Sequence, residues 1–92
     1  MDDKSALSGL RVLDFSHLLA GPFATQILGD YGATIYKIER AEVGDDYRRW
    51  HFFNKKVGGT QAATFLSWNR NKRSLAIDMK SSKGKDILFK MV

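Results

Sequence analysis

The stretch LRVLDFSHLLAGPFATQILGDYGATIYKIE, residues 10–39, decides the fold of this 92-residue chain. Its first six residues, LRVLDF, are mostly apolar, which predicts a buried strand over residues 10–15. After a short break, Gly21 and Pro22 open a helical pattern. A proline suits the first turn of a helix because the N–H that it lacks needs no partner there. The stretch is therefore predicted to begin as a strand, a tight turn and a helix.

The second half of the stretch completes a strand–helix–strand unit. Apolar residues recur at helical spacing from Phe23 to Tyr31. Gly32 follows at the position where a helix commonly ends in the left-handed conformation. The run ATIYKIE, residues 33–39, then predicts a second strand. A βαβ unit of this size is expected to hold its two strands parallel through a right-handed crossover.

The residues that follow continue the α/β pattern. Residues 40–60 are polar, charged and glycine-containing, and are predicted as a long loop, which is often functional. Thr60 is a candidate cap for a helix that reaches Asn69, and RSLAID, residues 73–78, predicts a third strand. The predicted order is β-α-β-loop-α-β-α, an α/β fold with a parallel sheet of three strands and about three helices.

A final helix shows an apolar face up to the last residue. Ser81 or Ser82 can cap its start, and its apolar positions continue to Val92 with no recognisable cap. We therefore expect these residues to be the front of a longer polypeptide.

Composition indicates a folded, basic protein. The chain is 43% hydrophobic and 12% aromatic, so it is expected to fold around a core. Its net charge of +5 suits anionic partners such as phosphates, nucleotides, nucleic acids or acidic substrates. It has no cysteine, which excludes disulfides and thiolate chemistry. Because no apolar run could span a membrane and the polar N-terminus is unlike a signal peptide, we expect a soluble cytoplasmic protein.

The turn LAGP, residues 19–22, is the first candidate site. A helix N-terminus presents unpaired N–H groups and a partial positive charge, which suit a phosphate or another anion. Gly21 also removes a side chain that would block close approach of a ligand to the backbone. A tight connection with no ligand explains the same residues equally well, so both interpretations stay open. The G-x-G-x-x-G pattern and the Walker loop are missing, which argues against NAD and against a P-loop nucleotide.

Charged residues also follow the second and third predicted strands. Ligands of open α/β sheets bind outside the carboxyl ends of the strands. Arg40 lies at such an end and is a candidate for contact with an adenine face or a phosphate oxygen, and Lys80 follows the third strand in the same way. Asp78 either accepts a hydrogen bond from a ribose or an adenine amine or stabilises the N-terminus of the next helix.

Other polar residues are better explained without a ligand. His17 is interpreted as a structural hydrogen-bonding residue, and His51, among aromatic residues, as packing or lid material. The two histidines form no cluster with metal-ligand spacing, so no metal is expected. They also form no Ser-His-Asp set that would predict nucleophilic catalysis by a serine. The charges of the GDDYRR segment are interpreted as a solvated loop that neutralises itself: Asp45, Asp46, Arg48 and Arg49.

Two long stretches, LSGLRVLDFSHLLAGPFATQILGDYGATIYKIERAEVGDDYRRW (residues 7–50) and LSWNRNKRSLAIDMKSSKGK (residues 66–85), carry a set of ordered motifs. These motifs are R-V-L-D, A-G-P, G-D-x-G-A, K-I-E, G-D-x-x-R and N-K-R-S. In that order they resemble the amino-terminal segment of the family III CoA-transferases, the formyl-CoA and carnitine-CoA transferase family. Tyr36 departs from the family, which usually has an apolar residue there. The GDDYRRW loop is nearest to the dicarboxylate-using members, of the succinyl-CoA:glutarate type.

The resemblance implies a fold and a ligand. It implies that residues 1–92 are the amino-terminal part of a Rossmann-like, CoA-binding large domain, with the remainder of the enzyme missing. The substrate would be coenzyme A, as acyl-CoA, and no metal is implied. The residues that match the CoA contacts of the family come from the turn and the two strand ends: Leu19, Ala20, Arg40, Ile77, Asp78, Met79 and Lys80.

The resemblance also implies a reaction. The catalytic residue of the family is an aspartate that attacks the acyl-CoA carbonyl, forms a mixed anhydride and later carries CoA as a thioester. No aspartate here matches it, so no catalytic residue is assigned within residues 1–92 and the nucleophile is expected downstream of Val92. Family members form interlocked homodimers and act on an acyl-CoA and a carboxylic acid, with no nucleic acid or membrane as partner. The 92 residues alone are expected to be inactive.

Two alternatives remain open. The related α-methylacyl-CoA racemases share the turn and the third-strand motif, although GDDYRRW and SWNRNKRS favour a transferase. A small basic α/β module that binds nucleic acid also fits the net charge, and it would show salt-dependent RNA binding without affinity for CoA.

Overall fold

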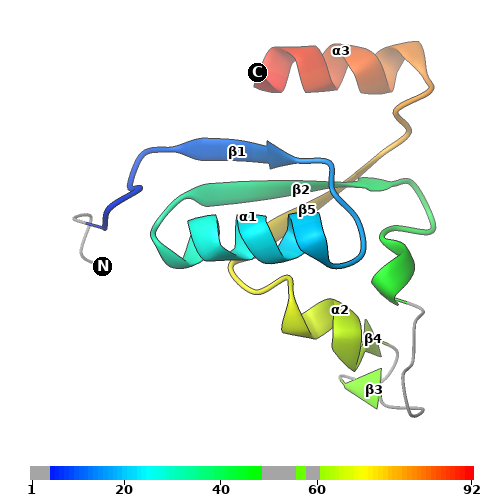
Figure 1. Cartoon of the computed structure of the whole chain (residues 1–92). Coiled ribbons are helices and arrows are strands. Elements are labelled where there is room, and N and C mark those ends of the chain that lie inside the picture. Colours follow the sequence, from blue (N-terminus) through cyan, green and yellow to red (C-terminus); the bar gives the residue numbers. More distant parts are fainter. Residues whose placement is uncertain (1–4, 49–55, 58–60) are drawn as a thin grey trace.

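The computed structural model describes residues 5–48, 56–57 and 61–92, which are built around a parallel three-stranded sheet (Figure 1). The strands are β1 (Arg11–Asp14), β2 (Thr34–Arg40) and β5 (Lys72–Ile77), in the order β1-β2-β5. Both pairs of neighbours, β1 with β2 and β2 with β5, are parallel. The predicted α/β fold with a parallel sheet is confirmed, and β2 lies in the middle of that sheet.

Helices lie on opposite sides of the sheet. Helix α1 (Ala20–Asp30) connects β1 to β2 and packs closely enough that a Cβ atom on Gly29 would lie 3.3 Å from the Ile35 side chain. Side chains alternate along a strand, so Tyr36 points to the other face. There, helix α3 (Ser82–Met91) and the sheet line a hollow of about 820 Å³ between Tyr36 and Met91. The sheet is therefore covered closely by α1 and loosely by α3.

Two predicted helix boundaries are confirmed. Helix α1 ends at Asp30, Tyr31 is its C-cap, and Gly32 comes next. Gly32 has a φ of +107°, which glycine adopts without strain. Of the two serines before α3, Ser81 is the N-cap, because its Oγ accepts a hydrogen bond from the Gly84 amide at 3.0 Å. A side chain at Gly84 would overlap the Asp78 carbonyl group, so α3 begins in direct contact with the end of β5.

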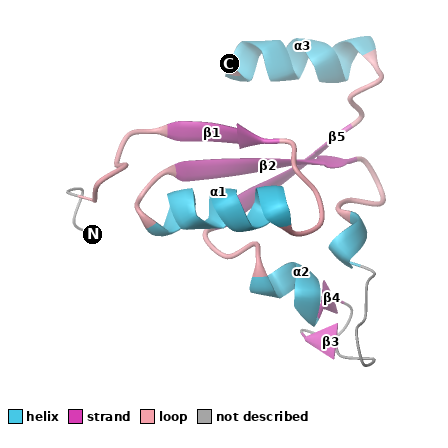
Figure 2. Cartoon of the chain, viewed as in Figure 1, coloured by secondary structure: helices cyan, strands magenta, loops and turns pink. Residues whose placement is uncertain are grey.

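The segment between β2 and β5 contains more regular structure than predicted (Figure 2). A 3₁₀ turn covers Asp46–Arg48, and the short strands β3 (Lys56–Val57) and β4 (Gln61–Ala62) pair antiparallel. The prediction that residues 40–60 form a plain loop is therefore wrong where residues are described. The predicted helix begins later, as α2 (Ala63–Ser67), because the residues before it are used for strand pairing. Thr60, the predicted cap, lies outside the described residues.

The interior is unusually polar, which corrects the prediction that residues 10–15 form a buried strand. The strand is shorter than predicted, since β1 covers only Arg11–Asp14, and Leu10 and Phe15 on either side of it are 45% and 48% exposed. In α1 the apolar stripe of Phe23 and Ile27 is exposed, whereas Pro22 and Gln26 are buried. The physical reason is that α1 covers the face of the sheet that carries charged side chains. The described apolar core is small: Ala33, Ile35, Ile38, Phe65 and Ile77.

Within the part of the chain that the structure describes, the helices are too short and too polar for any of them to traverse a lipid bilayer.

Candidate functional site

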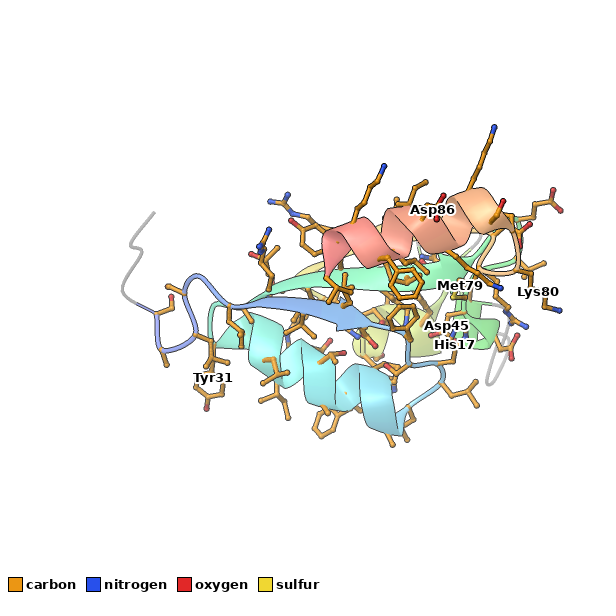
Figure 3. All side chains as sticks on the ribbon, turned by 90° about the horizontal axis from the view of Figure 1, so that it is seen from above. His17, Tyr31, Asp45, Met79, Lys80 and Asp86 are labelled. Carbon is orange, nitrogen blue, oxygen red and sulfur yellow. The ribbon has the colours of Figure 1, made fainter. Side chains whose placement is uncertain are left out.

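The carboxyl ends of β2 and β5 lie side by side. Arg40, the last residue of β2, is in register with Ile77, the last residue of β5. Because both strands are parallel, the residues that follow them emerge at the same edge of the sheet. The turn after β1 leads to the N-terminus of α1 at this edge as well, and His17, Asp45, Met79 and Lys80 gather there (Figures 1 and 3). The edge holds every candidate segment predicted from the sequence.

Arg40 and the segment after β5 line one hollow. It has a volume of about 470 Å³ and is lined by residues 40–43 and 77–80. Five of the seven candidate residues are therefore brought together: Arg40, Ile77, Asp78, Met79 and Lys80. Leu19 and Ala20 lie at the same sheet edge, at the start of α1, but do not line this hollow.

Arg40 is held at the rim of the hollow with its side chain 46% exposed. Its guanidinium donates a hydrogen bond to the Gly44 carbonyl oxygen at 3.2 Å and forms an ion pair with Asp46. The turn that follows β2 thus orients the guanidinium while leaving it open to solvent. An exposed pair of this kind is weak, so an incoming anion can compete with Asp46 for Arg40.

Asp78 shapes the turn from which Lys80 projects. Its Oδ1 accepts a hydrogen bond from the Lys80 amide at 3.1 Å, and its carbonyl oxygen accepts from the Ser81 amide at 3.2 Å. Of the two interpretations of Asp78, these contacts support the structural one, since Oδ1 serves the turn before α3. Lys80 is exposed at the edge of the molecule (Figure 3).

The N-terminus of α1 at Leu19 and Ala20, called here the mouth of α1, has no capping side chain. Leu19 is the N-cap residue, and the structure shows no side-chain hydrogen bond at that cap. The first N–H groups of α1 are therefore not satisfied by a side-chain cap, as an anion site requires. Leu18 before it has a φ of 68°, in the left-handed region that a residue such as leucine rarely adopts.

Gly21 has an internal explanation. A Cβ atom at this position would overlap the Ser16 side chain, so the close packing of the turn against α1 requires a glycine. The expectation that Gly21 leaves space for a ligand is not needed to explain the residue. Here the structural interpretation of the turn is the better supported one.

Asp45 is the buried centre of this edge. Its side chain is 0% exposed, and Oδ2 lies 2.9 Å from the Lys37 ammonium. Its Oδ1 accepts a hydrogen bond from the Leu18 amide at 3.2 Å, while the Lys37 ammonium also donates to the Ser16 carbonyl oxygen at 3.0 Å. The interpretation of this segment as a solvated, self-neutralising loop is therefore wrong for Asp45, whose buried partner comes from β2. Arg49 lies outside the described residues.

Glu39 forms the second buried contact between β2 and the following turn. Arg48 binds both of its carboxylate oxygens, from Nε and from a terminal nitrogen, each at 2.7 Å. Ser74 and the Asp45 amide also donate to it. Burial raises the pKa of Glu39, but these donors outweigh burial and hold the pKa at about 2. Glu39 is thus a carboxylate at neutral pH.

A third buried pair lies beneath α1. The Lys72 ammonium is 3.2 Å from Asp14 Oδ2 and donates to the Pro22 carbonyl oxygen at 2.9 Å. Burial raises the pKa of Asp14, but hydrogen bonds from Ser16 and Thr25 and the charge of Lys72 outweigh burial, so the net shift of the pKa is downward. Burial lowers the pKa of Lys72 despite the attraction of Asp14. This pair ties β1, β5 and the first turn of α1 together.

Sequence reasoning missed these buried charges. Their signal was the alternation of Lys37 and Glu39 within an apolar strand, followed by G-D-x-x-R. Residues two apart in a strand share a face, so two charges separated by one residue require partners on that face. Asp45 and Arg48 are those partners.

The described residues contain no group of three or more His, Cys, Asp or Glu side chains that could hold a metal ion. His17 is half-buried beside this edge, and His51 lies outside the described residues.

Comparisons with known proteins show which family the chain resembles. Residues 7–92 match the sequence pattern of the family described as CoA-transferase family III. The chain is 44% identical over 88 residues to the human succinyl-CoA:glutarate CoA-transferase, covering 96% of this chain and 19% of that protein. It is 39% identical over 87 residues to a formyl-CoA:oxalate CoA-transferase of Bradyrhizobium diazoefficiens, covering 95% of this chain and 20% of that protein.

Solved structures are similar as well. A CaiB/BaiF family protein from Brucella suis superimposes with a TM-score of 0.81 at 38% identity, over 91% of this chain and 22% of that one. A Mycobacterium tuberculosis protein in an orthorhombic crystal form gives a TM-score of 0.84 at 34% identity, over 98% and 24%. The chain spans about a fifth of the length of the curated relatives that it matches.

Proposed function

The chain belongs to CoA-transferase family III, and from this premise we propose that it forms the CoA-binding front segment of an enzyme that moves CoA from an acyl-CoA to a carboxylic acid. In this proposal, residues 1–92 are the amino-terminal part of the large domain. The observation that carries the proposal is the hollow shared by Arg40 and residues 77–80. These residues are the ones that the family motifs assign to CoA.

The side chains around the hollow suit a ligand with anionic and apolar parts. Arg40 and Lys80 supply positive charge for phosphate oxygens, and a guanidinium can hold such an oxygen with two donors. Val43, Ile77 and Met79 add apolar surface for an adenine or a pantetheine chain. The volume of about 470 Å³ lies in the range typical of small-molecule sites. The CoA nucleotide matches this combination of charge and apolar surface.

The mouth of α1 is proposed as the third part of the site. Leu19 and Ala20 are exposed at the same sheet edge, and the N–H groups behind them carry the positive end of the helix dipole. Negative groups of CoA that extend beyond the hollow would be stabilised there. This part rests on the family motif and on the absence of a capping side chain at Leu19.

The reaction itself is proposed to need a nucleophilic aspartate from outside residues 1–92. Its attack on the acyl-CoA carbonyl carbon would expel the CoA thiolate and leave a mixed anhydride, which the thiolate then cleaves to give an enzyme thioester and the donor acid. The acceptor carboxylate takes CoA from that thioester. The role of the described residues is to bind and orient CoA during these steps.

A dicarboxylate acceptor and an interlocked homodimer complete the proposal for the whole enzyme. The relatives named for succinyl-CoA and glutarate, from human, mouse and Agrobacterium fabrum, support the dicarboxylate. The GDDYRRW loop, which resembles those members, supports it as well.

Calorimetric titration of the chain with CoA tests the proposal, with circular dichroism to confirm that the protein is folded. We expect saturable binding that weakens when the 3′-phosphate of CoA is removed, since the cationic side chains would lose one anionic partner. Folded protein that binds RNA in a salt-dependent manner but does not bind CoA would contradict the proposal and favour a nucleic-acid module.

A further inference from the structure

Three segments of the chain meet at the buried side chain of Asp45. The turn before α1 reaches it through Leu18, β2 reaches it through Lys37, and Asp45 itself begins the turn at Asp46–Arg48. The Asp45 side chain is 0% exposed and the Lys37 side chain 1% exposed. Taking two charges out of water is costly, and well-packed apolar residues often stabilise a fold as well as such a pair. Stability alone therefore does not explain the pair.

The geometry points to another role, which rests on the function proposed above: we propose that Asp45 is a positioning residue that fixes the mouth of α1 for CoA. Its Oδ1 accepts from the Leu18 amide at 3.2 Å, and Leu18 is the residue whose φ of 68° turns the chain into α1. Such a backbone conformation persists only where the surroundings determine it. Asp45 provides this constraint directly before Leu19 and Ala20.

Lys37 orients Asp45 for this task. Its ammonium contacts Asp45 Oδ2 at 2.9 Å and the Ser16 carbonyl oxygen at 3.0 Å, so one cation holds both the carboxylate and the turn that the carboxylate serves. The Asp45 amide donates to Glu39 Oε1 at 2.9 Å, which anchors the backbone of Asp45 to β2 as well. The position of the mouth of α1 relative to the end of β2, and thus to Arg40, follows from these contacts.

Two double variants separate positioning from stability. Lys37→Met/Asp45→Asn removes both charges but keeps a side-chain oxygen that can accept from the Leu18 amide. Lys37→Met/Asp45→Leu also removes both charges and has a similar volume, but it offers no acceptor. Asp86 is an exposed carboxylate on α3, and Asp86→Asn is the matched surface control. All are measured in the 92-residue chain, by denaturant unfolding, by CoA titration and by hydrogen exchange of the Leu18 amide.

We expect the variant without an acceptor to bind CoA about tenfold more weakly than the variant with one, the size of effect that loss of a single buried hydrogen bond produces. Its Leu18 amide should exchange faster, while Asp86→Asn matches the native chain. Equal CoA affinity and equal Leu18 exchange in the two double variants would overturn the proposal, as would faster exchange without weaker CoA binding.

The native chain provides an independent measurement that no folding defect can obscure. Leu18 amide exchange should be strongly slowed there, and exchange at the rate of an unstructured peptide would refute the role of Asp45. A native chain with a protected Leu18 amide that binds no CoA would instead refute the proposed function and leave Asp45 as the residue that holds the turn.

Discussion

Arg40 is the residue on which the proposed CoA site depends most. Among the described residues, Arg40 is the cationic side chain that lies at the end of a strand and also lines the hollow opposite the segment after β5. We expect Arg40→Ala to weaken CoA binding about tenfold, which is the loss expected for a charge-assisted hydrogen bond to a phosphate. In the complete enzyme the same change should raise the KM for acyl-CoA with a smaller effect on kcat.

Arg73→Ala is the matched control for this measurement. Arg73 is exposed near the start of β5, at the end of the strand remote from the hollow. Replacing it with alanine removes the same charge from the chain as Arg40→Ala does. Calorimetric titration of the two variants should therefore differ. If Arg73→Ala weakens CoA binding as much as Arg40→Ala does, only net charge matters and Arg40 does not belong to the site.

Glu39 makes the stability of the fold sensitive to acid. Its pKa is about 2 in the folded chain against an ordinary value of 4.5, so the unfolded chain takes up the proton first as the pH falls. The stabilisation is complete above pH 4.5 and is lost as the pH falls toward about 2. Over this window the shift corresponds to about 3 kcal/mol.

Urea unfolding between pH 5 and pH 2.5 tests this prediction, with Glu39→Gln as the comparison. The native chain should lose more unfolding free energy over the window than the variant, because the variant has no proton to bind at this position. The Asp14 carboxylate, whose pKa is also lowered, leaves an acid dependence in both proteins. Parallel pH profiles for the two would show that Glu39 is not held as a carboxylate.

At the scale of elements, the connection from β2 to the 3₁₀ turn depends on Gly44. Its φ is +69°, and a Cβ atom would lie 2.8 Å from Glu39 Oε1 and 3.0 Å from Arg48 Cδ. Gly44→Ala should therefore strain the backbone and displace the Glu39–Arg48 pair, at a cost of about 2–4 kcal/mol.

Gly9→Ala separates the two contributions to that cost. Gly9 also has a positive φ, +87°, but no atom lies within 4 Å of the position of its Cβ. We expect Gly9→Ala to reduce the unfolding free energy by about 1 kcal/mol, which reflects backbone strain alone. Similar unfolding midpoints for the two variants in denaturant would mean that crowding against Glu39 does not matter.

Local patterns predicted the elements of the fold but not which faces they bury. The βαβ unit, the third strand and the start of α3 at Ser81 depend on short-range signals such as strand runs, Pro22 and a capping serine. Helical periodicity alone does not indicate which stripe of α1 faces the sheet, and the apolar stripe of Phe23 and Ile27 is exposed. Gln26 is buried because its Oε1 accepts a hydrogen bond from the Arg70 amide, a contact between distant segments that no local pattern contains.

The candidate site was predictable in part for the same reason. Arg40 ends β2 and Lys80 comes soon after β5, and the rule that ligands bind at the carboxyl ends of strands placed both at one edge of the sheet. Asp45 was not predictable from its own neighbourhood, since its sequence neighbours are polar and its partner Lys37 is eight positions earlier. Only the pairing of two charged patterns, K-I-E and G-D-x-x-R, indicates that both become buried.

At the scale of the whole molecule, the two faces of the sheet differ in chemistry. The face under α1 holds the buried ion pairs that fix the turns at the carboxyl edge, the edge of the sheet where β1, β2 and β5 end. The face toward α3 is more open, and the exposed Phe15 contributes to a hollow with Phe89 and Val92. By the alternation of side chains along β2, the proposed CoA contact Arg40 belongs to the more open face, together with Tyr36, while the buried ion pairs hold the turns at the same sheet edge from the other face.

This arrangement predicts that the 92-residue chain binds CoA without transferring it. A carboxylate nucleophile must reach the thioester carbon, but Asp14, Glu39 and Asp45 are buried and held by Lys72, Arg48 and Lys37. Asp46 is paired with Arg40, and Asp78 Oδ1 is engaged by the turn that it forms. These contacts commit all five of these carboxylates to structural roles. Incubation with succinyl-CoA and labelled glutarate should give no labelled glutaryl-CoA.

Glu42 is the residue that this prediction must exclude, because it is exposed and lines the same hollow as Arg40. If the chain alone shows turnover, Glu42→Gln identifies the source: loss of turnover would make Glu42 a nucleophile, since a glutamate side chain can form the same anhydride as an aspartate. Turnover that survives Glu42→Gln would place the nucleophile on a residue other than Glu42. Either result would contradict the proposal that this segment binds CoA while another part of the enzyme supplies the nucleophile.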